Sequence, residues 1–81
     1  MKLKKILKHL DYLSQIKVLS FDPKNKFEDE HFCGHPLDCP YWIADFHLDT
    51  SNDWDPIEII KEDAEGHLLE EPYLELWVKE E

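Results

Sequence analysis

The sequence lacks any apolar run near the roughly 20 residues that span a bilayer, so we expect no membrane partner. Its lysine-rich opening, residues 1–10, also lacks the uninterrupted apolar stretch of about 7–15 residues found in secretion signals, which indicates a cytoplasmic protein. Cysteine is scarce as well. Cys33 and Cys39 are too few for a disulfide framework, and we expect both to be free thiols.

Positive charge is in the minority. Nine basic residues stand against nineteen acidic ones, for a net charge of -10. Because an acidic domain repels nucleic acids and anionic membranes, we expect neither as a direct partner. The charge is also uneven: residues 1–20 hold five lysines against Asp11 alone and carry +4, whereas residues 21–81 hold four lysines against eighteen acids and carry -14. The chain is therefore polarised along its sequence.

The length of 81 residues fits a single domain, residues 1–81, because domains rarely fall below about 50 residues. Apolar residues recur at the helical spacing of three and four at Leu3, Ile6, Leu7, Leu10 and Leu13. Lysines fill the positions between them, so this pattern predicts an amphipathic N-terminal helix that ends between His9 and Leu13.

Short-period apolar patterns predict about five strands in the rest of the chain. They cover Ile16–Phe21, Phe27–Cys33, Phe46–Leu48, Ile57–Ile60 and a final segment His67–Lys79. Asp22–Lys26, with Pro23, predicts a hairpin turn between the first two strands, and the acidic residues 28–30 place the second strand at a solvated edge. Pro72 is expected to begin the last regular strand, in which residues 74, 76 and 78 face one way and residues 73, 75 and 77 the other.

A short extra helix is expected near residues 39–45, with Asp38 as its N-cap, Pro40 in its first turn and Trp42 in the core. These elements define an α+β class: an N-terminal amphipathic helix packed on a small antiparallel sheet of about five strands. A small open barrel of the same strands is the alternative.

One tract has residue types that suit zinc. His31, Cys33, His35 and Cys39 lie within nine residues, but they form a single tract rather than the two separated ligand pairs of structural zinc sites. In the alternative interpretation, Cys33 simply fills the core and the two histidines are solvated. A cysteine–histidine nucleophile pair has no supporting motif and only two glycines to shape a loop, so we expect no enzyme and no cofactor.

Aromatic residues exceed what a core of this size hides comfortably. Trp54, Tyr73 and Trp77 have acidic neighbours, and exposed Trp and Tyr are typical anchors of protein interfaces. The alternative is that helix and loops cover both faces of the sheet. The acidic segments also allow the chain to act as a decoy that mimics a nucleic-acid backbone.

The order of the landmarks resembles small prophage-associated bacterial proteins of unknown function. The landmarks are Leu3–Leu10, Gln15–Phe21, the segment Asp38-Cys39-Pro40-Tyr41-Trp42, and Leu74–Val78. The resemblance implies a cytoplasmic accessory protein and brings no activity. The leading hypothesis is therefore a non-enzymatic interaction module that binds another protein or itself, with zinc binding by His31–Cys39 and the acidic decoy as alternatives.

Overall fold

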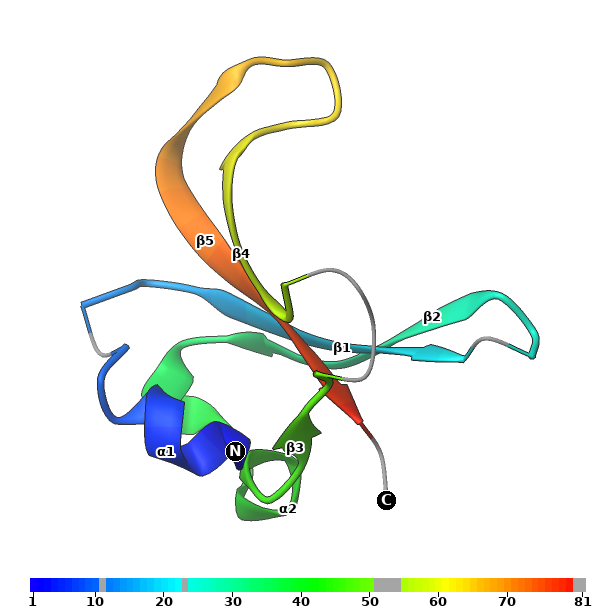
Figure 1. The fold of residues 1–81 in the computed structure, drawn as a ribbon. Coiled ribbons are helices and arrows are strands. Elements are labelled where there is room, and N and C mark those ends of the chain that lie inside the picture. Colours follow the sequence, from blue (N-terminus) through cyan, green and yellow to red (C-terminus); the bar gives the residue numbers. More distant parts are fainter. Residues whose placement is uncertain (11, 23, 51–54, 80–81) are drawn as a thin grey trace.

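The computed structural model describes residues 1–10, 12–22, 24–50 and 55–79. The elements in chain order are α1 (Leu3–Leu7), β1 (Ile16–Asp22), β2 (Phe27–Gly34), the 3-10 helix η1 (Pro36–Asp38), α2 (Tyr41–Ala44), β3 (His47–Leu48), β4 (Ile57–Glu62) and β5 (Leu68–Lys79). Within the described ranges, two short α-helices lie beside an open five-stranded sheet (Figure 1). The mixed class and the strand positions match the sequence-based expectation, while Pro23 of the expected turn lies outside the described residues.

β5 is the central strand of the sheet. β1 pairs with its residues 74–77 on one edge, and β4 and β3 pair with it antiparallel on the other, while β2 continues the sheet beyond β1. The β1–β5 pair is parallel, from Ile16 opposite Leu74 to Leu19 opposite Trp77. The expectation of a wholly antiparallel sheet is therefore wrong. The long connection through β2, both helices, β3 and β4 supplies the crossover that a parallel pair needs.

The backbone of Trp77 fixes both ends of the connection between β3 and β4. Its carbonyl accepts a hydrogen bond from the N–H of Asp49 at 2.9 Å, and its own N–H donates to the carbonyl of Pro56 at 2.8 Å. On the far side of β3, Leu3 N–H donates to the Phe46 carbonyl at 2.8 Å. The chain start thus extends the sheet next to β3.

The first helix is much shorter than its apolar spacing predicts. α1 spans five residues, Leu3–Leu7, and then continues in turns rather than reaching His9 or beyond. Among the described residues no side chain caps its start, and its first turn carries no acid, whereas Lys4 and Lys5 lie in its last turn, where positive charge suits the helix dipole. Isolated helices of this length are marginal, and contacts of Leu3 and Leu7 with the core hold the turn in place.

The hydrophobic core lies on one face of the sheet. Its buried members are Leu3, Leu7, Leu10, Ile16, Val18, Ile43, Leu48, Leu74, Leu76 and Val78. Both α-helices and the strands β1, β3 and β5 contribute to this cluster. In Figure 1 the helices lie together at the bottom, while the β4–β5 hairpin extends upward and the β1–β2 hairpin extends to the right.

The segment around α2 corrects three expectations. Asp38 does not cap α2 but ends the 3-10 helix η1, and Pro40 is the N-cap residue rather than part of the first turn. Trp42 is 55% exposed, whereas Ile43 is buried at 1%. Because α2 is only four residues long, one side of a single turn faces the core, and Ile43 occupies it.

Pro72 lies inside β5 rather than at its start. The pairing of β4 with β5 is irregular between Ile60 and Glu62, where the partner residues on β5 jump from Tyr73 to Leu68. A bulged stretch tolerates a residue that has no N–H to donate, which explains how the strand accommodates the proline.

Candidate interaction surface

The sheet has one face that the core does not use. Successive strand residues point to opposite faces, and the even-numbered residues 74–78 of β5 are buried in the core, so Tyr73, Glu75 and Trp77 lie on the other face. The register places Lys17 and Glu58 opposite Glu75, one from each neighbouring strand. We call this surface the open face. Its central residues are Lys17, Leu19, Glu58, Tyr73, Glu75 and Trp77, of which Leu19 is buried.

A groove of about 600 Å³ lies at this surface. It is lined by Phe21, Glu28, Asp55, Ile57, Glu58 and Trp77. The β1–β2 hairpin supplies the first two of these residues, Asp55 precedes β4, the start of β4 supplies the next two, and β5 supplies the tryptophan. Ile57 pairs with Leu76 and also packs against the core. Of these lining side chains among the described residues, three are apolar and three are acidic, so the groove combines an apolar wall with carboxylates.

Negative charge accumulates beside the groove. Partial burial raises the pKa of the Glu75 carboxyl above its usual value, and the Glu58 carboxylate raises it further. Lys17 opposes this shift, and Glu28 adds to it. Three carboxyl groups, those of Glu28, Glu58 and Glu75, thus act on one another here, with Lys17 as the opposing charge.

Lys17 interacts with two side chains of its own chain, Tyr73 and Glu30. Its Nζ lies 5.2 Å from the centre of the Tyr73 ring and 4.0 Å from Oε1 of Glu30. A cation near an aromatic face is attracted by the electrons of the ring. Tyr73 therefore holds a cation within the fold, whereas Trp77 lines the groove.

The structure brings together two of the three predicted interface residues. Tyr73 and Trp77 lie on the open face and are half-buried, while Trp54 lies outside the described residues. The sequence did not single out the groove residues Phe21, Glu28 and Ile57. The period of two in their strands sets each side chain on a face, but only the pairing of β1 with β5 brings Phe21 and Trp77 to one groove.

The four candidate zinc ligands point to different surroundings. Nε2 of His31 lies 2.8 Å from Oγ of Ser20, and its ring packs edge-on against Phe46 at 5.4 Å. Sγ of Cys33 accepts a hydrogen bond from Nε2 of Gln15 at 3.0 Å. His31 is an extra residue in the pairing with β1, since Phe32 pairs with Val18 and Glu30 with Leu19, and this bulge breaks the alternation that placed His31 with Cys33.

The side chains of the other two candidates, His35 and Cys39, contact backbone groups of neighbouring residues. Nδ1 of His35 accepts a hydrogen bond from the N–H of Leu37 at 3.1 Å, which caps η1. Sγ of Cys39 lies 3.7 Å from the carbonyl of Pro40. Among the described residues no three His, Cys, Asp or Glu side chains are grouped as a metal ion requires.

The two thiols differ in environment. Cys33 is exposed, so the interpretation that it fills the core is wrong. Cys39 is half-buried, and burial raises the pKa of its thiol to about 11. A thiol with so high a pKa is a poor nucleophile at neutral pH.

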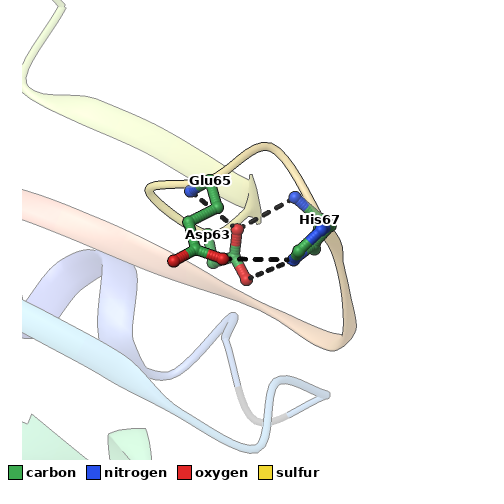
Figure 2. A network of polar contacts seen from close by, with 3 residues as sticks. All are labelled: Asp63, Glu65 and His67. Atoms are coloured by element: carbon green, nitrogen blue, oxygen red, sulfur yellow. Dashed lines mark hydrogen bonds and ion pairs between the residues drawn. The ribbon is translucent and has the colours of Figure 1, made fainter.

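One further cluster of ionisable groups lies at the tip of the β4–β5 hairpin. Figure 2 shows Asp63 between Glu65 and His67: its Oδ1 accepts the backbone N–H of both residues at 2.9 Å. Nδ1 of His67 lies 3.6 Å from Oδ2 of Asp63 and 3.7 Å from Oε2 of Glu65. Gly66 completes the turn with a φ of 86°, a conformation that favours glycine. These contacts stabilise the hairpin turn, and this structural role explains why the three ionisable side chains lie together.

No protein-family model matches the chain, and comparison with curated proteins and with solved structures found no match either. None of the described helices is long and apolar enough to cross a bilayer. The fold and the groove thus define a small protein of mixed class with an acidic, partly apolar open face.

Proposed function

We propose that the protein is a non-enzymatic interaction module whose groove binds a basic segment of another protein. The observation that carries this proposal is the lining of the groove, in which Phe21 and Trp77 stand beside the carboxylates of Glu28 and Glu58. Aromatic anchors supply most of the energy at protein interfaces. Complementary charge increases the rate of association and favours partners of the opposite charge.

The N-terminal segment supports the groove in this proposal. As an amphipathic segment, it packs on the core face of the sheet through Leu3 and Leu7, whose side chains belong to the buried cluster. The open face is then left for a partner. In keeping with the resemblance to prophage-associated proteins and with the free thiols, we place this activity in the cytoplasm of a bacterium.

The chemistry of the groove defines the partner. Lysine or arginine side chains would meet the carboxylates, and an aromatic or aliphatic side chain would contact Trp77. Such segments are common in proteins that bind nucleic acids, and for a partner of that kind the acidic open face would act as a decoy. Binding would weaken as salt is added, because these carboxylates lie at or near the surface.

Selection from a random peptide display library tests the proposal. We expect the wild-type protein to enrich peptides that carry both basic and aromatic residues. Glu58→Lys reverses one charge in the groove and should weaken binding of these peptides at least about tenfold. Glu62→Lys makes the same change on the same strand, at an exposed residue outside the groove lining, and should leave binding unchanged. The proposal fails if no peptide is enriched or if Glu58→Lys binds as the wild type does.

A further inference from the structure

We propose that a second copy of this chain occupies the groove, inserting a lysine-rich surface formed by its two helices. This inference rests on the proposed function, since it takes the groove as a binding site and names the partner. We call the inserting surface the helical end. Its exposed members are Lys4, Lys5, Lys8, Tyr41 and Trp42.

The helical end has the composition that the groove requires. Tyr41 is 82% exposed and Trp42 is 55% exposed, which is unusual for large aromatic side chains in a monomer. The lysines of α1 lie on the side of the helix away from its buried residues Leu3 and Leu7. The two helices contact each other, and Nζ of Lys4 lies 3.3 Å from Oδ1 of Asp45 at the end of α2. Cations and exposed rings therefore share one end of the molecule.

Charge complementarity selects this occupant. Residues 1–20 carry +4 and residues 21–81 carry -14, so the helical end of one copy is attracted to the acidic open face of another. At the contact, lysines would meet Glu28 and Glu58, and an exposed ring would face the apolar wall at Trp77. Both requirements of the groove are met by one surface of the same chain.

The contact must join two molecules. The buried side chains of both helices belong to the cluster on the core face, whereas Glu58 and Trp77 lie on the opposite side of the sheet and line the groove. A helical end therefore cannot reach the groove of its own chain. Because the two surfaces differ, the contact is heterologous, and each added copy leaves one groove and one helical end unused. We expect short, reversible chains of molecules rather than a closed dimer.

Two variants separate the two halves of the contact. Glu58→Lys damages the groove and leaves the helical end intact, whereas Lys5→Glu combined with Lys8→Glu damages the helical end and leaves the groove intact. In sedimentation velocity the wild-type average mass should rise with concentration and fall with added salt. Each variant alone should remain monomeric. Their equimolar mixture should form a 1:1 dimer that grows no further, because only one intact groove can meet one intact helical end.

Matched controls carry the same charge changes at exposed positions elsewhere. They are Glu62→Lys for the groove, and Lys24→Glu combined with Lys61→Glu for the helical end. Both should associate as the wild type does, and circular dichroism should show that all variants keep the fold. The inference is overturned if the wild type is a monomer at all concentrations, or if the mixed variants stay monomeric. If peptide selection at the groove succeeds while self-association is absent, only the identity of the partner is wrong; if both fail, the proposed function is wrong as well.

Discussion

Glu58 lies directly opposite Glu75 across the antiparallel pair of β4 and β5. Like charges at opposed positions of a sheet are destabilising, and here they coincide with partial burial of Glu75. In the proposed function, a partner that brings positive charge to the open face would relieve this repulsion on binding.

Stability should respond to pH through Glu75. Its pKa is raised in the folded protein above the usual value of 4.5, so folding favours the protonated form. That contribution is fully present below 4.5 and is lost as the pH rises through the higher folded pKa. Glu75→Gln has no carboxyl group to ionise and so does not lose stability in this way. The free energy of unfolding of the variant, relative to that of the wild type, should therefore increase as the pH rises from 4.5 through the folded pKa of Glu75. Urea denaturation at several pH values measures the difference, with Glu70→Gln, an exposed position on β5, as a control that should show no such trend.

The core depends on the central strand. Leu76 is fully buried, and Leu76→Ala should reduce the free energy of unfolding by about 2–5 kcal/mol, since the shortened side chain leaves a cavity. Ile59 on the neighbouring strand is 57% exposed, and Ile59→Ala should change the free energy of unfolding by about 0.5–1 kcal/mol at most. Ile59 pairs with Leu74 and therefore lies on the same face of the sheet as Leu76, so equal effects in chemical denaturation would contradict the difference in burial between Leu76 and Ile59.

The tip of the β4–β5 hairpin depends on one side chain. Asp63→Ala removes the acceptor for the backbone N–H groups of Glu65 and His67 and should destabilise the protein by about 1 kcal/mol. Glu65→Ala removes only an exposed contact with His67 and should cost less than about 0.5 kcal/mol. Thermal unfolding of the two variants, compared side by side, would refute this assignment if Glu65→Ala had the larger effect.

The thiols should react at different rates. Cys33 is exposed, whereas burial raises the pKa of the Cys39 thiol to about 11. At mildly alkaline pH, iodoacetamide should modify Cys33 at least about tenfold faster than Cys39. Mass spectrometry of Cys33→Ser and Cys39→Ser, each with one remaining thiol, gives the two rates. Faster modification of Cys39 would show that its burial is not as described.

Local patterns predicted the strands but not their arrangement. The alternation of residues 73–78 correctly separated the buried face of β5 from the open face, and the acidic residues 28–30 correctly indicated that β2 lies at an edge. Alternation is the same for parallel and antiparallel neighbours, however, so it could not reveal that β1 runs parallel to β5. The groove depends on that pairing, because it brings β1 alongside Trp77.

The helices show where periodicity misleads. Leucines at helical spacing continue to Leu13, but α1 ends at Leu7. Its first turn has no acid and no capping side chain among the described residues, and an apolar stripe does not by itself sustain a helix. Trp42 is a large apolar residue two positions after a proline, yet Ile43 fills the core. Which residue of a single turn faces inward is decided by how that turn docks, which composition does not encode.

The most direct test of the interaction surface is the amide spectrum of isotope-labelled protein as unlabelled protein is added, up to roughly millimolar concentration, where contacts of about 4 kcal/mol become populated. We predict that signals of groove residues such as Phe21, Glu58 and Trp77 shift together with those of Lys5 and Trp42, and that added salt reverses the shifts. Shifts confined to other surfaces, with the groove signals unchanged, or no shift at any concentration, would contradict the assignment of the groove as the site of self-association.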